Sequence, residues 1–262
     1  NTSVLNNNGS NTLAVSQITS ASGDYSVTFT AATNLPFNLT LCNAWYSYQT
    51  GLYNDFNTWT LDPSGATFDN PANVFPSSGD DITVLNGFTV TYNVSNTTLN
   101  SATIQGGGIL NMASTTGHNL GVVTGTGLLR VQGVNLPTGT YTDFVSTLGG
   151  TVEYYNTGGN LPTTQTTYNK LVFSNSTGAN ITYVLVSDLT ANGSVTLSTT
   201  GAGTVNWQIN DASNVNRTIT LNNDLIVASG GRINVGTGNE GSTTPHTLNM
   251  YGNITNAGVI KF

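Results

Sequence analysis

The sequence predicts an all-β protein built as a right-handed parallel β-helix, a solenoid in which short strands stack coil upon coil. Three observations predict this fold. Apolar and polar residues alternate along many short segments, and helix-forming residues such as Glu, Lys, Arg, Gln and Met are scarce. A second pattern also recurs about every 30 residues, within the range of solenoid repeats. It consists of two alternating apolar residues, then Asp or Asn followed directly by Leu or Ile, and a Gly three to five residues later.

Alternation with a period of two residues indicates the strands. The segments combine β-branched or aromatic residues at alternate positions with Gly, Asn or Ser at their ends, which suits a pleated, half-buried strand between turns. The clearest examples are residues 25–29, 82–85, 88–92, 195–197 and 219–221.

The recurring pattern is clearest at residues 182–195, 218–233 and 247–260, with a looser copy at 118–129. One copy is too short to bury its own apolar residues, whereas stacked copies would line a continuous interior. Gly193, Gly230 and Gly258 are expected at the corners of coils. The residues expected to face the interior are Val184, Val186, Leu189, Val195, Ile219, Leu221, Leu225, Ile233, Leu248, Met250 and Ile254.

A β-sandwich is the competing fold, because turn signals every 8–12 residues also suit it. Hairpins in such a fold favour Asn-Gly turns. Beyond the first 42 residues only Asn86-Gly87 and Asn192-Gly193 have that form, and this scarcity favours the solenoid.

Three segments are predicted: residues 1–42 as an N-terminal β segment or the end of a preceding β domain, 43–81 as an aromatic-rich cap, and 82–262 as solenoid repeats that continue further. The cap interpretation expects most of its large aromatic side chains to be buried against the first coil, and an alternative makes the segment a carbohydrate-binding platform. The residues expected to be buried are Trp45, Tyr46, Phe56, Trp59, Phe68 and Phe75. The platform would use Trp45, Tyr48, Tyr53 and Trp59.

Composition excludes several classes of function. Charged residues make up 6% of the chain, against about 25% in an ordinary domain. The five basic residues are scattered, so no basic stripe indicates nucleic-acid binding. No apolar run approaches the ~20 residues of a membrane span.

The chain has no starting Met, no signal peptide and no lipidation motif, so it is expected to be part of a longer, processed protein. Its single cysteine, Cys42, is expected to be a small buried side chain.

Candidate catalytic residues are few, and the sequence predicts no catalytic site and no cofactor. His118 and His246 both precede a predicted strand, so they are expected at strand starts near the surface. Asp80 and Asp81 are adjacent, which places them on opposite faces of a strand. Asp188 and Asp224 are expected to cap turns. A polysaccharide-active β-helix enzyme, which needs paired carboxylates, is therefore the weaker alternative.

Metal binding is also considered. No Asp-x-Asp-x-Asp-Gly loop and no Gly-Gly-x-Gly-x-Asp repeat occurs, so no metal site is predicted. Asp62, Asp69 and Asn70 could together contribute oxygen ligands to an irregular calcium site, and this alternative stays open.

Two blocks of the chain resemble segments of large secreted proteins of Bacteroidota. The first block comprises WYS at 45–47, NTWTL at 57–61 and PSSGDDITVLNGFTV at 76–90, and the second comprises GGTVEYY at 149–155, YNKLVFSNS at 168–176 and LTANGSVTL at 189–197. These relatives are cell-surface adhesins and gliding-motility-associated proteins exported by the type IX secretion system.

The resemblance covers residues 45–262 and implies an extracellular, cell-surface structural segment of an adhesin. It implies export or outer-membrane anchoring components as partners, with surface glycans or self-association as further possibilities. It carries over no ligand-binding residue.

Overall fold

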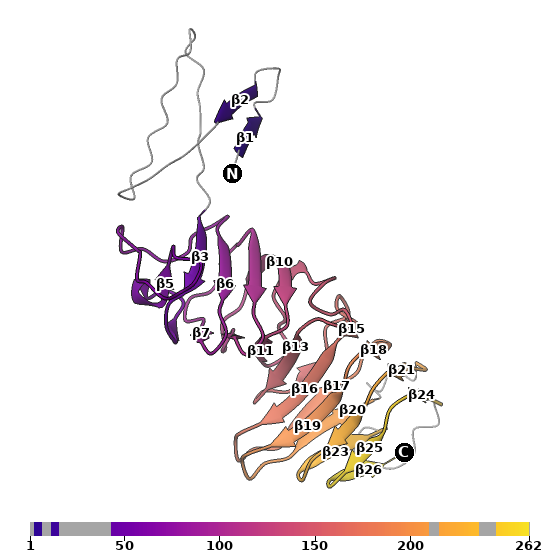
Figure 1. Cartoon of the computed structure of the whole chain (residues 1–262). Helices are drawn as coiled ribbons and strands as arrows, with labels where there is room; N and C mark the ends of the chain where they lie inside the picture. The colour runs from indigo at the N-terminus through magenta and orange to yellow at the C-terminus, as the bar shows by residue number, and fades with distance from the viewer. Residues whose placement is uncertain (1–2, 7–11, 16–42, 210–214, 236–244, 262) are drawn as a thin grey trace. The chain divides into compact units, whose positions relative to one another are not determined.

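The computed structural model describes residues 3–6, 12–15, 43–209, 215–235 and 245–261, and these form strands and turns without an α-helix (Figure 1). The chain divides into two compact units, Asn1–Leu41 and Cys42–Phe262, next to the predicted boundary at residue 42. In the first unit, β1 (Ser3–Asn6) and β2 (Thr12–Val15) form an antiparallel pair. The predicted strand at 25–29 and the cysteine Cys42 lie outside the described residues.

Parallel pairing between successive coils organises the second unit. Among the described strands of this unit, every pairing is parallel except that of β3 with β5. The longest sheet contains nine strands, and each strand between its two ends is paired with the strand one coil before and the strand one coil after. They are β4 (Gly51–Leu52), β7 (Thr89–Thr91), β9 (Ile109–Asn111), β11 (Leu128–Gln132), β13 (Thr151–Tyr155), β16 (Lys170–Asn175), β19 (Val195–Thr199), β22 (Leu225–Val227) and β25 (Ile254–Asn256).

Three further sheets complete the coils. A six-stranded sheet contains β5 (Trp59–Thr60), β3 (Ala44–Ser47), β6 (Asp81–Val84), β8 (Ser101–Ile104), β10 (Asn119–Gly125) and β12 (Thr138–Thr140). A five-stranded sheet contains β14 (Gly159–Asn160), β17 (Ile181–Val184), β20 (Val205–Gln208), β23 (Gly231–Asn234) and β26 (Val259–Lys261). A four-stranded sheet contains β15 (Thr167–Tyr168), β18 (Leu189–Ala191), β21 (Thr218–Leu221) and β24 (Thr247–Met250). A short 3₁₀ helix, η1 (Phe56–Thr58), precedes β5.

The coils change size along the stack. The first coil contains the aromatic segment and is long, because Ala44 pairs with Asp81, 37 residues further along. In the early coils that follow, Asp81 lies beside Ser101 and Thr103 beside Thr124, at separations of 20 and 21 residues. In the last coils Asp188 lies beside Thr218 and Asp224 beside Asn253, at separations of 30 and 29 residues. The predicted repeat of about 30 residues is therefore correct only for the last coils. The early coils have two strands each, and the late coils have three.

The number of strands per coil changes at one place, which we call the step, residues 133–150. Coil length rises later, because Lys170 lies 19 residues after its partner Thr151, Val195 lies 24 after Leu171, and Leu225 lies 30 after Val195. The six-stranded sheet ends at the step with β12, and the five- and four-stranded sheets begin directly after it, whereas the nine-stranded sheet passes through from β11 to β13. The architecture is thus β-helix-like, with a two-sided first part and a three-sided second part.

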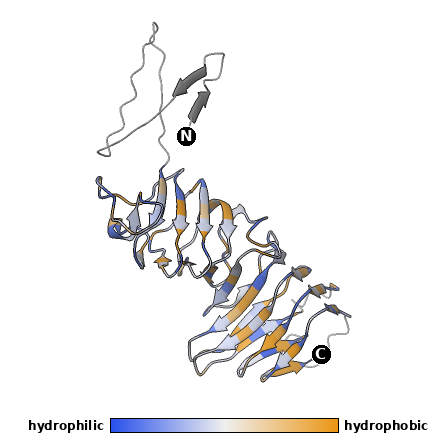
Figure 2. Cartoon of the chain, viewed as in Figure 1, coloured by the Kyte–Doolittle hydropathy of each residue, from blue (hydrophilic) through white to orange (hydrophobic). Residues whose placement is uncertain are grey.

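Alternation places one set of side chains in a continuous core, and Figure 2 shows apolar residues recurring on strands throughout the stack. Six of the predicted interior residues are buried, which confirms them: Leu189, Val195, Ile219, Leu221, Leu225 and Ile233. Leu248 and Met250 are half-buried against the same core. Ile254 lies in register with Leu225 but is 48% exposed, because no described coil covers it.

The prediction for Val184 and Val186 is wrong. The inward residues of this segment are Ile181, Tyr183 and Leu185. The odd-numbered and the even-numbered residues of 181–186 are both largely apolar, so alternation alone could not show which set faces the interior. Stacking selects the phase, because Tyr183 pairs with Trp207 of the next coil and lies 5.0 Å from the ring of Phe173.

The predicted corner glycines do lie between strands of different sheets. Gly230 has φ of +79° and a backbone conformation that other residues rarely adopt. Asn86-Gly87 joins β6 to β7, which belong to different sheets, so it forms a coil corner and no hairpin.

The register predicts that neighbouring residues of one strand respond differently to truncation. Leu197 is fully buried between Phe173 and Val227, whereas Thr196 faces outward. We expect Leu197→Ala to lower the free energy of unfolding by about 2–5 kcal/mol and Thr196→Ala to change it by less than about 0.5 kcal/mol. Urea unfolding of both variants measures this, and equal losses would contradict the inward and outward assignment.

Candidate functional site

The aromatic segment 43–81 presents few exposed rings. Trp45, Tyr53 and Trp59 are buried, and Tyr48 is half-buried against Phe68. The four residues of the proposed carbohydrate platform therefore do not form an exposed stacking surface. Their rings turn inward because β3, β4 and β5 form the first layer over the coils, and Tyr53 stacks on Tyr92 of the next coil at 4.1 Å.

The cap prediction holds only in part. Of the six aromatic residues expected to be buried, Trp45 and Trp59 are buried, Tyr46 and Phe56 are half-buried, and Phe68 and Phe75 are exposed. The prediction that most are buried is therefore wrong. Phe68 and Phe75 lie in the turns between β5 and β6, where no strand covers them.

Asp80 ties the aromatic segment to the first coil. Its carboxylate is buried and accepts hydrogen bonds from Asn43 N (2.8 Å), Trp45 Nε1 (3.0 Å) and Ser77 N (2.7 Å). Asp81 points the other way and accepts from Asn100 and Ser101 of the next coil. The two carboxylates therefore face different partners, and each serves as a structural acceptor.

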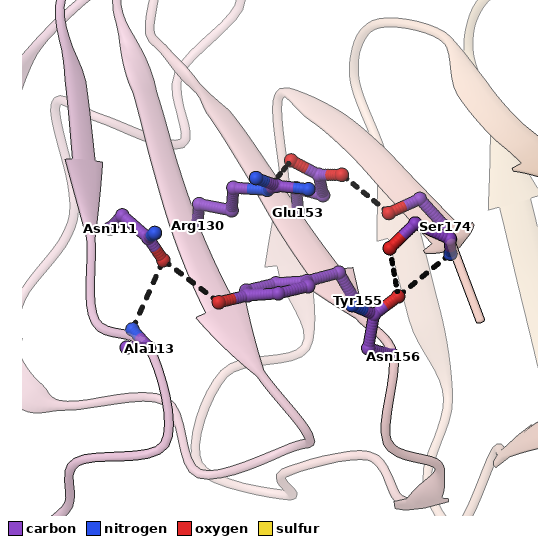
Figure 3. A network of polar contacts seen from close by, with 8 residues as sticks. Asn111, Ala113, Arg130, Glu153, Tyr155, Asn156 and Ser174 are labelled. Atoms are coloured by element: carbon purple, nitrogen blue, oxygen red, sulfur yellow. Dashed lines mark hydrogen bonds and ion pairs between the residues drawn. The ribbon is translucent and has the colours of Figure 1, made fainter. Parts of the chain in front are cut away.

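A polar network crosses the outer face of the nine-stranded sheet at the step (Figure 3). Arg130 Nε lies 2.8 Å from Glu153 Oε2, the only ion pair in the part of the chain that the structure describes. The guanidinium also lies over the ring of Tyr155, 4.1 Å from its centroid. Glu153 accepts a second hydrogen bond from Ser174, and Tyr155 donates to Asn111 (3.1 Å).

This network joins four successive coils, because Asn111, Arg130, Glu153 and Ser174 lie on β9, β11, β13 and β16. Both carboxylate oxygens of Glu153 have partners, and Arg130 neutralises its charge. The network therefore acts as a clasp across the step. The clasp is not predictable from the 30-residue repeat, because that repeat does not bring Arg130 beside Glu153, which lies 23 residues further along the chain.

His118 is buried, so the prediction of a surface position is wrong; it is 4% exposed. Its Nδ1 lies 2.8 Å from Thr97 Oγ1 and its Nε2 lies 3.0 Å from Thr115 Oγ1. Thr115 donates its own proton to Met112 O, so it can only accept from His118. The neutral ring therefore carries its proton on Nε2 and accepts from Thr97 at Nδ1.

With both nitrogens engaged, His118 offers no free base to a substrate. Desolvation by burial lowers its pKa below the ordinary value of 6.5, so the neutral form dominates at neutral pH. His246 precedes β24 of the four-stranded sheet, whereas His118 precedes β10 of the six-stranded sheet, so the two positions are not equivalent. His246 Nδ1 accepts from Arg217 N at 3.1 Å.

The remaining candidate acids bond within the stack. Asp188 accepts from Thr218 N and Asp224 from Asn253 N, both at 2.8 Å, which confirms them as turn caps that join one coil to the next. Asp188 precedes β18 and Asp224 precedes β22, on different sheets, so they form no carboxylate pair.

Two of the three residues considered for calcium, Asp62 and Asn70, are engaged in separate local contacts. Asp62 closes its own turn by accepting from Ser64 and Thr67, and these hydrogen bonds lower the pKa of its exposed carboxyl. The buried Asn70 bonds the backbone of Phe56 and Val74. Across the described residues, no group of three or more His, Cys, Asp or Glu side chains is placed to hold a metal ion.

Buried tyrosines supply the other titratable groups of the core. The hydroxyls of Tyr154 and Tyr168 are hydrogen-bonded at 3.0 Å, and the Tyr168 hydroxyl donates a hydrogen bond to Gln165 O. Burial raises the pKa of Tyr168 to about 12. A tyrosine held this firmly in its protonated form serves as a hydrogen-bond donor and is poorly suited to act as a base at neutral pH.

Comparison of the chain with protein-family models, curated proteins and solved structures gave no significant match. Among the described residues, no helix has the length and apolar character needed to cross a membrane.

The clasp predicts a measurable coupling. We expect Arg130→Met to lower the free energy of unfolding by about 1–3 kcal/mol, because it leaves the Glu153 carboxylate largely buried without a counter-charge. Adding Glu153→Gln should recover part of this loss. A double-mutant cycle in urea measures the coupling, and strictly additive losses would show that the pair does not act as a unit.

His118 predicts a pH dependence of stability. Its folded-state pKa is lowered, so the unfolded chain binds the proton more readily. The stabilisation is therefore complete above pH 6.5 and is lost as the pH falls below 6.5 towards the folded-state pKa. We expect the melting temperature of the wild-type protein to fall more steeply between pH 7 and pH 5, a window chosen to bracket the ordinary histidine pKa of about 6.5, than that of His118→Gln. Parallel slopes would contradict the assignment.

Proposed function

We propose that the chain is a non-catalytic structural segment, a stalk or fibre section of a secreted bacterial cell-surface adhesin, folded as a right-handed β-helix. The observation that carries the proposal is the nine-stranded parallel sheet, which runs without interruption from β4 to β25. Every coil adds one strand to it, so backbone hydrogen bonds join neighbouring coils along the stack. Such a ladder suits a stiff spacer.

The arrangement of the polar groups supports a structural role. Asp80, His118, Glu153, Asp188 and Asp224 each bond to the backbone or to neighbouring side chains of the stack. None of them pairs with a second acid in the way that glycoside cleavage requires.

The resemblance to secreted surface proteins of Bacteroidota supplies the biological setting of the proposal. It supports an extracellular location at the cell surface, export by the type IX secretion system, and contact with outer-membrane anchoring components. The low content of charged residues agrees with a surface made polar by Asn, Thr, Ser and Gly.

Single-molecule stretching between the two ends of residues 43–262 tests the proposal. A stack of coils should open in a series of steps. At about 3.3–3.6 Å per residue, the coils between Asp81 and Gly125 should release roughly 65–75 Å each and the coils between Val195 and Ile254 roughly 100 Å each. Leu197→Ala should lower the force of the late steps only. Opening of the whole unit in a single event at low force would argue against a stalk that resists tension.

A further inference from the structure

The step contains a cavity of about 420 Å³ that the stalk role does not use. It is lined by Thr116, Gly117, His118, Asn135, Leu136, Pro137 and Thr138. Its volume lies within the range of about 300–1,000 Å³ that is usual for small-molecule sites. The cavity forms where the chain leaves the six-stranded sheet, between the turn that precedes β10 and the segment that leads into β12.

The walls of the cavity are held in place by the fold. Thr138 donates from N (2.9 Å) and from Oγ1 (3.1 Å) to His118 O, which fixes the two walls against each other. The buried Tyr141 donates to Pro137 O at 2.8 Å. At Gly117, with φ of +77°, a Cβ atom would lie 2.1 Å from Asn96 Oδ1, so glycine allows the close approach that shapes the turn.

Two neutral polar groups at the rim of the cavity are solvent-exposed and therefore accessible to a ligand. The hydroxyl of Thr116 and the side-chain amide of Asn135 make no hydrogen bond to any described part of the chain, whereas the backbone N of Thr116 is satisfied by Ser95. Leu136 and Pro137 supply an apolar wall beside them. The lining contains no Asp, Glu, Lys or Arg, and burial keeps His118 neutral.

We propose that this cavity binds a neutral saccharide. A sugar ring offers hydroxyls that can both donate and accept, which matches a free hydroxyl and a free amide, and it offers a C–H face that packs on Leu136 and Pro137. An anionic ligand has no cation in the lining and faces a chain of net charge −7, and a cationic ligand has no carboxylate there. The proposal is independent of the stalk role and would give the segment a glycan contact of its own.

Binding to a glycan array of neutral, acidic and amino sugars, followed by saturation-transfer NMR with the best neutral oligosaccharide, tests the proposal. We expect binding in the micromolar to millimolar range, at least tenfold weaker for Asn135→Ala. Thr116→Trp should abolish binding because the indole fills the cavity. Asn160→Ala, at an exposed asparagine of β14 on the far side of the step in sequence, is the matched control and should bind as the wild type does.

Circular dichroism and the melting temperature establish that each variant keeps its fold. The proposal is overturned if no neutral glycan binds at millimolar concentration, if only acidic or amino sugars bind, or if binding survives both Asn135→Ala and Thr116→Trp. The stepwise opening of the stalk under force is unaffected by any of these results, so the two proposals fail separately.

Discussion

Backbone pairing between successive coils is the interaction on which the rest of this structure depends. A strand of the nine-stranded sheet receives its hydrogen bonds from the coil before and the coil after it. This pairing requires that each coil return to register, but it does not set how many residues the coil uses on the way. The early coils can therefore close after 20 or 21 residues and the late ones after 29 or 30 without breaking the sheet.

Pairing also dictates what the side chains must do. Because successive residues of a strand face opposite sides, each coil contributes one set of side chains to the interior, and these stack on the equivalent side chains of its neighbours. Tyr183 and Trp207 are such equivalent residues, paired in register on neighbouring coils, and the ring of Phe173 from the nine-stranded sheet packs against both, with centroids 5.0 and 5.5 Å away. A single isolated coil could not bury its own apolar side chains.

Hydrogen bonds from polar side chains, and not ion pairs, join most neighbouring coils at their corners. Asp188, Asp224 and Asn180 each accept a backbone N–H from the next coil, at 2.8, 2.8 and 2.9 Å. Acceptors of this kind cap the corners without the desolvation that a charged pair would need. The clasp of Arg130 and Glu153 is the exception, and it lies at the step, where the stack changes from two sides to three. The same irregularity that requires a clasp also leaves the hollow beside His118.

Sequence alone determined the chemical class of the fold: β-branched alternation, corner glycines and scarce helix formers are local properties, and they predicted strands at 82–85, 88–92, 195–197 and 219–221 where the structure has them. It also indicated that the few acids would cap turns, since Asp and Asn recur at the same place before an aliphatic residue. Tertiary structure alone decided the number of residues in each coil, which side chains of residues 181–186 face inward, the burial of His118 and the contact between Arg130 and Glu153. Each of these depends on which residue of a neighbouring coil lies alongside. That choice is made by packing between segments 20 to 30 residues apart, which the alternation within one strand does not record.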